Sequence, residues 1–86
     1  MATHKSARKR ARQSIKRRTR NRELRTRTKG AVKRVRTALE TKDAESTRST
    51  LLTAESVLRR AASKGALPKK RASRLIGRLA RHANSV

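Results

Sequence analysis

Apolar residues in the middle of this chain recur at helical spacing. From Leu24 onward one stripe advances in steps of three and four, through Leu24, Thr28, Ala31, Val32, Val35, Ala38 and Leu39. The preceding stretch has only Ala7, Ala11 and Ile15 at such spacing. The pattern predicts one long helix over about residues 6–40, after an N-terminal tail at 1–5, with a core-forming face on its second half only.

A second helix is predicted over about residues 44–64. Asp43 is a candidate N-cap, because its carboxylate can accept from the free backbone N–H groups of the next turn. Gly65 is typical of the residue just past a helix end, and Lys64 would lie in the last turn, where a cation is favoured. The apolar stripe of this helix consists of Ala44, Thr47, Leu51, Ala54, Leu58 and Ala61, widened by Leu52 and Val57.

A third helix is predicted over about residues 68–84, with Pro68 at its first position. Its stripe consists of Ala72, Leu75, Ile76, Leu79, Ala80 and Ala83. Three amphipathic helices with short loops pack most simply as an antiparallel three-helix bundle, so we expect an all-α fold in one domain over residues 1–86. A first helix of about 34 residues would be roughly 50 Å long against about 25–30 Å for the others, so its basic N-terminal half must overhang.

Charge changes this picture more than hydropathy does. The 86 residues include 27 Lys and Arg against 5 Asp and Glu, a formal net charge of +22. Sixteen of the bases and one acid, Glu23, lie between Lys5 and Arg36. Such unbalanced charge destabilises a compact state unless a polyanion neutralises it. Nucleic acid is therefore the expected partner, and Arg, which outnumbers Lys, offers a bidentate fork that matches phosphate.

The charge of residues 37–86 suggests how the three helices are arranged. Residues 37–58 are mildly acidic, whereas residues 59–86 carry nine bases and no acid. A third helix that returned alongside the first would join two basic surfaces and leave the second helix as the solvent-facing or acid-balanced side.

The basic N-terminal segment, Lys5 to Arg22, is poorly suited to stand alone. Bases follow one another in it at i,i+4 steps, where each pair of like charges costs a few tenths of a kcal/mol. The chain also has only fourteen Leu, Val and Ile residues and no aromatic one, too few for more than marginal stability. We expect this segment to be disordered in the free protein and helical on RNA.

Catalysis and metal binding lack the residues they need. The chain has no Cys, and its two histidines, His4 and His82, have no acid nearby in the sequence. Helix capping accounts for Asp43 and Glu45 better than a metal site does. We therefore predict no catalytic or metal-binding residue, no cofactor and no small-molecule substrate, and we expect a protein that is not an enzyme.

Membrane and targeting segments are also disfavoured. No run of 18 apolar residues could span a membrane, and no apolar segment of a secretory signal follows the basic start. A helix lying on a membrane would need more apolar residues than Ile15. A transit peptide fits poorly, because the positive charge continues to Arg81.

Charge alone does not separate RNA from DNA. The chain has no zinc-ligand set, no leucine zipper, no aromatic stacking pair and no apolar wedge in its basic stretch. Its bases can contact phosphate, and Ser6, Gln13, Ser14 and Thr19 can bond sugar hydroxyls. Such contacts recognise the shape of a folded nucleic acid more than its base sequence. They favour structured RNA, with a nucleoid-type DNA-compacting protein as the alternative.

Two motifs stand out in the sequence: residues 4–18 read HKSARKRARQSIKRR, and residues 61–65 read AASKG, followed by PKKRASRL at 68–75. They resemble the motifs of the ribosomal protein S20 family of the bacterial small subunit. The resemblance covers essentially the whole chain and implies a three-helix bundle that binds 16S rRNA directly. The family's place is in the 5′ domain and against the penultimate stem of that RNA, where it stabilises RNA folding during 30S assembly.

The resemblance also implies partners, location and contact residues. We expect contacts to other small-subunit components through the assembled particle, no homo-oligomer, and a place in the cytoplasmic ribosome of a bacterium, with an organellar ribosome as the alternative. In the first motif the implied RNA-contacting residues are Lys5, Ser6, Arg8, Lys9, Arg10, Arg12, Gln13, Ser14, Lys16, Arg17 and Arg18, and Arg22 at the end of the basic segment is included with them. The second motif adds Lys64, Gly65, Lys69, Lys70, Arg71 and Arg74.

Overall fold

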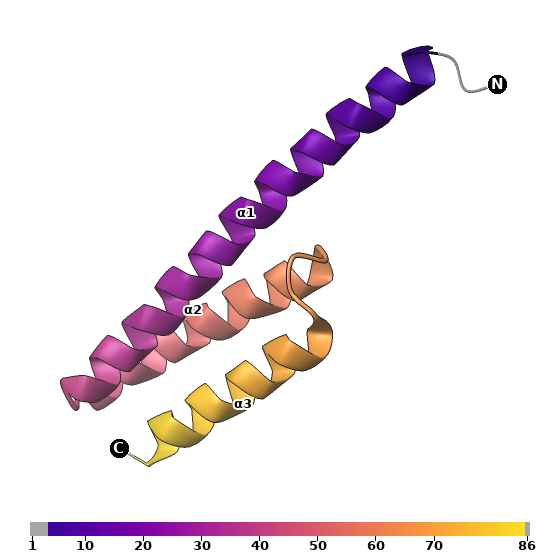
Figure 1. The fold of residues 1–86 in the computed structure, drawn as a ribbon. Coiled ribbons are helices and arrows are strands. Elements are labelled where there is room, and N and C mark those ends of the chain that lie inside the picture. Colours follow the sequence, from indigo (N-terminus) through magenta and orange to yellow (C-terminus); the bar gives the residue numbers. More distant parts are fainter. Residues whose placement is uncertain (1–3, 86) are drawn as a thin grey trace.

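Three helices, each antiparallel to the one before it, make up the computed structural model, which describes residues 4–85 (Figure 1). Helix α1 spans His4–Glu40, α2 spans Ala44–Ser63 and α3 spans Lys69–Asn84. The described residues contain no strand. This confirms the predicted all-α bundle with a long first helix.

The end of α1 is closed by a residue that the sequence did not single out. Lys42 has φ 57°, in the left-handed region, and its N–H donates to the carbonyl of Leu39 at 3.2 Å. The hydroxyl of Thr41 donates to the carbonyl of Ala38 at 2.9 Å. Together these bonds satisfy carbonyls that a helix end leaves free, and they turn the chain towards α2.

The start of α2 has the predicted cap. One carboxylate oxygen of Asp43, Oδ1, accepts from the backbone N–H of Glu45 at 3.1 Å and of Ser46 at 3.2 Å. A side chain of this kind at an N-cap stabilises a helix by about 1 kcal/mol relative to Ala. The carboxylate of Asp43 is therefore used by the helix end.

The end of α2 depends on Gly65, as predicted. Its φ is +79°, a conformation in which an L side chain is strained. The N–H of Gly65 donates to the carbonyl of Ala62 at 3.1 Å, and the N–H of Ala66 donates to that of Ala61 at 2.9 Å. This pair of bonds is a Schellman motif. Lys64 is the C-cap, so α2 ends one residue earlier than predicted.

Two helix starts differ from the predictions. Pro68 is the N-cap of α3, because its ψ of 137° is extended and its carbonyl accepts the N–H of Ala72 at 3.0 Å. The helix therefore begins at Lys69. At the N-terminus, His4 and Lys5 are already helical, so the prediction of a tail over residues 1–5 is wrong for these two. Residues 1–3 lie outside the described residues.

The core lies where the second half of α1 meets the other two helices. Its main cluster consists of Ala31, Val32, Val35, Ala54, Leu58 and Leu79, with Leu39, Leu51, Val57, Leu67, Leu75 and Ile76 packed around it. A second cluster joins Leu24 to Ala61 and Ala66 at the α2–α3 loop. Every buried α1 residue belongs to the predicted stripe, and small side chains let the helices approach closely.

Helix α2 is the central element of the bundle. It packs against both α1 and α3, and the direct contact between α1 and α3 is the smallest of the three. The prediction that α3 lies alongside α1 with α2 left facing solvent is therefore wrong. The reason is the width of the α2 stripe, since Leu51 and Val57 both pack on the core cluster around Leu58 and give α2 apolar surface for two neighbours.

The first part of α1 lies outside the bundle. Residues 4–20, which we call the overhang, are all exposed, and Leu24 is the first buried residue at 5% exposure. Figure 1 shows this end of α1 extending well beyond α2 and α3. It gives the molecule extents of 61 × 20 × 13 Å. At 1.5 Å per residue the overhang projects by about 25 Å.

Candidate nucleic-acid interface

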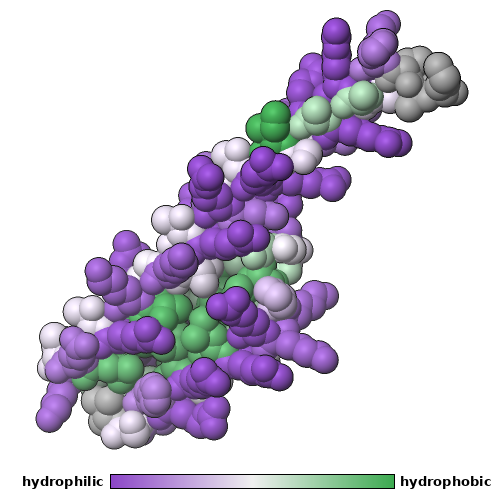
Figure 2. Space-filling model, in the orientation of Figure 1, coloured by the Kyte–Doolittle hydropathy of each residue, from purple (hydrophilic) through white to green (hydrophobic). Residues whose placement is uncertain are grey.

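The overhang is a helical rod of positive charge. Residues 4–20 contain nine Lys and Arg and no acid, and every one of them is exposed. Because successive residues of a helix turn by about 100°, these bases point in several directions around the axis. Figure 2 shows purple, hydrophilic side chains projecting along most of the overhang, which also carries a few green, hydrophobic ones, while the largest green area lies between the helices of the bundle. Phosphates could therefore be bound on more than one side of the overhang.

One face of α1 is buried in the second half of the helix and exposed in the first half. In the bundle this face carries Leu24, Ala31 and Val35 against the other helices. Steps of three and four residues lead back from Leu24 to Arg17 and Arg10, which are exposed. The same helical face thus packs on protein in one half and presents polar, basic side chains in the other.

Two arginines of α1 fix the α2–α3 loop at the point where the overhang begins. Arg20 Nη2 donates to the backbone carbonyl of Lys64 at 3.1 Å, and Arg25 Nε donates to that of Ala66 at 3.2 Å. The neighbouring cluster of Leu24 with Ala66 holds the same loop by apolar contact. We call this region the junction.

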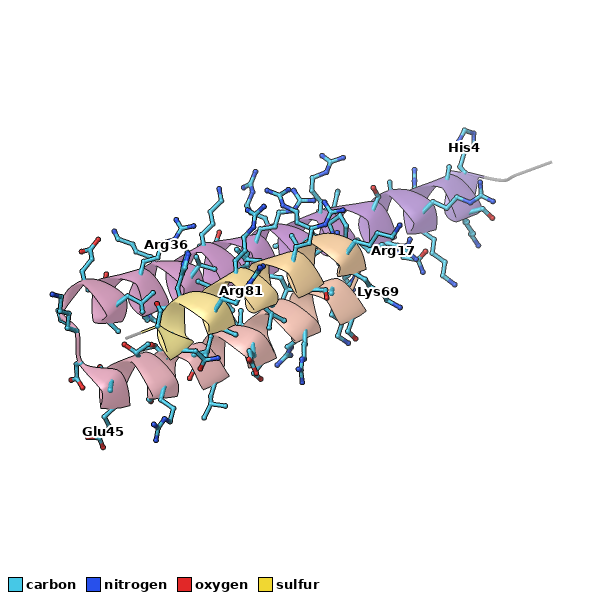
Figure 3. The ribbon with its side chains drawn as sticks, turned by 90° about the horizontal axis from the view of Figure 1, so that it is seen from below. His4, Arg17, Arg36, Glu45, Lys69 and Arg81 are labelled. Carbon is cyan, nitrogen blue, oxygen red and sulfur yellow. The ribbon has the colours of Figure 1, made fainter. Side chains whose placement is uncertain are left out.

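The junction brings the two sequence motifs together. Lys64, Gly65 and Lys69 lie at the end of the bundle from which the overhang projects, and all three are exposed. In Figure 3, Arg17 of α1 and Lys69 of α3 lie at this same end. The overhang and the α2–α3 loop therefore form one basic surface.

Every residue expected to contact RNA lies on the surface. Those of the first motif and Arg22 are exposed along α1, and those of the second motif are exposed on the loop and α3. The structure does not gather all of them at the junction. Arg71 lies in the first turn of α3 with Lys69, whereas Arg74 lies about one turn farther along this helix, which packs mainly on α2.

Three arginines that form contacts or line a hollow near the junction were not among the predicted site residues. Arg20 and Arg25 bond loop carbonyls more than 40 positions away, a relationship that no local pattern in the sequence signals. Arg59 of α2 lines a shallow hollow of about 200 Å³ together with Lys69 and Ser73 of α3. Only the packing of α3 on α2 brings these three side chains together.

The described residues were also compared with the requirements of a histidine pair, a metal site and a membrane-spanning helix. His4 and His82 are exposed and lie at opposite ends of the sequence. Within residues 4–85 no group of three or more His, Cys, Asp or Glu side chains is placed to hold a metal ion. None of the three helices is long and apolar enough to cross a membrane.

Comparison with known proteins agrees with the geometry. The family model described as Ribosomal protein S20 matches residues 2–84. The chain is 55% identical over 86 residues to the small ribosomal subunit protein bS20 of Desulfovibrio desulfuricans, covering 100% of this chain and 97% of that protein. It is 50% identical to the protein of the same name from Nitratidesulfovibrio vulgaris (100% and 99% covered) and 48% identical to that from Campylobacter curvus (100% and 97% covered). The chain therefore belongs to the ribosomal protein S20 family.

Proposed function

We propose that this protein is a structural constituent of the small ribosomal subunit that binds 16S rRNA directly and stabilises its folding during assembly. The observation that carries the proposal is the overhang, an exposed helical segment with nine bases and no acid that leaves the bundle beside a second basic motif. The overhang has no acid of its own to neutralise this charge, which makes a polyanion the partner that it fits.

Phosphate contact supplies the affinity in this account. Arg and Lys of the overhang displace counterions from the RNA, and the gain in free energy falls as salt rises. The bundle contributes by fixing where the overhang points, because the bonds from Arg20 and Arg25 join it to the α2–α3 loop. On RNA the protein is thus a folded bundle with a projecting cationic helix.

The all-round distribution of bases supports contact with more than one RNA segment. Overhang bases on opposite sides of the helix, such as Arg10 and Arg8, can bind phosphates of different strands at the same time. We propose that the segments are in the 5′ domain and the penultimate stem of 16S rRNA. An arm held between two RNA segments would link them, which is how it would stabilise the folded RNA.

Membership of the family supports a location in the ribosome. The relatives are bacterial proteins named for the small ribosomal subunit. We place this chain in the ribosome of the bacterial cytoplasm, as a structural component without catalytic activity.

Titration of the protein against 16S 5′-domain RNA at several salt concentrations tests the proposal. If six to ten phosphates are neutralised, log K should fall with log salt with a slope of roughly −5 to −9. Duplex DNA of equal length is the competitor. Preference for the RNA that persists at raised salt supports the proposal. Equal affinity for both would indicate a DNA-compacting protein instead, and a nearly flat salt response would exclude a phosphate-binding arm.

A further inference from the structure

A groove between α1 and α2 is separate from the junction and from every residue discussed as an RNA contact so far. Its volume is about 500 Å³. Helix α1 contributes Gly30, Lys33, Arg34, Thr37 and Ala38, the turn contributes Thr41, and α2 contributes Ser46 and Thr50. The lining residues thus include two bases, four hydroxyl-bearing residues and no acid, and most of the surface that they expose in the groove is carbon.

Neither packing nor backbone conformation in the described bundle requires a glycine at position 30. It lies in the interior of α1, where glycine destabilises a helix relative to alanine. Its φ is not in the left-handed region, so no turn requires it. A Cβ built at Gly30 would meet nothing within 4 Å, so no neighbouring helix requires it either. What the glycine does provide is a partly exposed stretch of helix backbone without a side chain at the wall of the groove.

The hydroxyls of the groove are oriented by the helices. Thr37 Oγ1 donates to the carbonyl of Lys33 at 3.0 Å, and Thr50 Oγ1 donates to that of Ser46 at 2.7 Å. Because these hydrogens are directed at the backbone, the oxygens retain lone pairs that can accept from a ligand. A ligand for this groove should therefore carry negative charge for the bases and hydroxyl donors for these oxygens.

The sugar–phosphate backbone of RNA has both features. Its phosphates match Lys33 and Arg34, and its 2′-hydroxyl is the donor that DNA lacks. An acidic peptide would match the bases but offers no regular series of hydroxyl donors. The chemistry of the groove therefore favours RNA.

The groove also continues the overhang. Steps of three and four residues connect its wall to the exposed arm along one face of α1, in the order Arg34, Gly30, Arg27, Glu23, Thr19, Lys16 and Arg12. This face carries one acid among four bases. The distance from Arg12 to Arg34 along the axis is about 33 Å, so a single RNA strand could follow it from the arm into the groove.

We propose that the α1–α2 groove is a second contact site for the RNA sugar–phosphate backbone, in which Gly30 permits close approach of a ribose to helix α1. The proposal rests on the proposed function, since it takes the ligand to be 16S rRNA. It adds a site on the bundle itself, reached from the overhang.

Paired glycine variants test it. Gly77 is also in a helix interior with nothing within 4 Å of a built Cβ, but it does not line the groove. Gly30→Ala and Gly77→Ala should therefore both raise the melting temperature of the free protein. We expect Gly30→Ala to weaken binding of full-length 16S rRNA several-fold, Gly30→Gln to weaken it further, and Gly77→Ala to leave it unchanged. Unchanged affinity for both Gly30 variants, or equal weakening by Gly77→Ala, would overturn the proposal.

Tethered cleavage supplies a second readout that does not depend on stability. The chain has no Cys, so Lys33→Cys creates a single attachment point for an iron chelate at the groove, and Ser56→Cys creates one on the exposed side of α2. Hydroxyl radicals should cut 16S rRNA from position 33 and not from position 56. Absence of cuts from position 33 would exclude the groove.

The two proposals can fail separately. If the unmodified protein shows no preference for 16S rRNA over duplex DNA, the proposed function fails and the groove proposal with it. If that preference holds and the Gly30 variants bind normally, only the groove proposal fails.

Discussion

Arg20 of α1 donates a hydrogen bond to the backbone carbonyl of Lys64, 44 positions later in the chain, at 3.1 Å. The bond joins the last residue of the overhang to the α2–α3 loop. Arg25, one turn further into the bundle, makes the equivalent bond to Ala66 at 3.2 Å. Two residues of a strongly basic helix thus act within the protein, and they determine where the loop bases lie relative to the arm.

Removal of these two side chains should have unequal effects. The bond from Arg25 is partly buried because its acceptor belongs to the buried residue Ala66, so Arg25→Met should lower the free energy of unfolding by about 1 kcal/mol. Arg20 is exposed, and Arg20→Met should lower it by at most about 0.5 kcal/mol. Urea unfolding at high salt, where charge repulsion is screened, measures both. Arg18→Met, on the exposed overhang, is the control and should change nothing; an equal loss for all three would show that the loop bonds are not responsible.

The charge of the overhang should matter for RNA and not for the bundle. In the double variant Arg12→Gln with Lys16→Gln, loss of two phosphate contacts should make the salt slope shallower by about 1.4–1.8. The melting temperature should stay the same or rise slightly, because like charges four residues apart repel. Binding titrations and thermal unfolding measure the two quantities.

A charge-matched control is available at the other end of the bundle. Lys42→Gln with Arg48→Gln removes the same two charges from the mildly acidic region around α2. This variant should keep the salt slope of the parent protein. If both double variants lose the same affinity, binding depends on net charge alone and the overhang has no special role.

The core should be sensitive to a single truncation. Leu58 is 0% exposed at the centre of the main cluster, so Leu58→Ala should cost about 2–5 kcal/mol. In a domain this small, that loss should abolish cooperative unfolding. Leu52→Ala on the same helix removes the same atoms from a side chain that is 65% exposed, and it should cost less than about 0.5 kcal/mol. Thermal unfolding followed by circular dichroism compares them, and similar losses would place the core elsewhere.

The two left-handed residues should respond to substitution with opposite signs. Gly65→Ala introduces a Cβ at φ +79° and should lower the free energy of unfolding by about 1 kcal/mol or more. Lys42→Gly relieves the strain of a side chain at φ 57° and should raise stability by up to about 1 kcal/mol. Urea unfolding measures both, and a gain from Gly65→Ala would contradict the Schellman geometry at the end of α2.

Much of the fold could be predicted because its signals are local. The stripe from Leu24 to Leu39, the Asp43 cap and the Gly65 helix end each depend on residues within a few positions of one another. The change at Leu24 from a polar to an apolar face also separated the overhang from the bundle in the sequence itself. These features are confirmed by burial and by backbone hydrogen bonds.

The features that were missed depend on geometry that local patterns do not contain. Pro68 suits either the N-cap or the first helical position, and only its ψ of 137° decides between them. Lysine has no preference for the left-handed conformation that Lys42 adopts. An apolar stripe says that a helix packs but not on which neighbour, so the central position of α2 and the loop contacts of Arg20 and Arg25 could not be foreseen.

The bundle is held by its own core, whereas we expect RNA to stabilise the overhang as a helix. Amide hydrogen exchange, measured residue by residue with and without 16S 5′-domain RNA, tests it most directly. We predict that amides of Val35 and Leu58 are protected in both states, whereas those of residues 7–19 exchange fast in the free protein and become protected on RNA. Equal protection of overhang and bundle in the free protein, or an overhang that stays unprotected in the complex, would contradict the account.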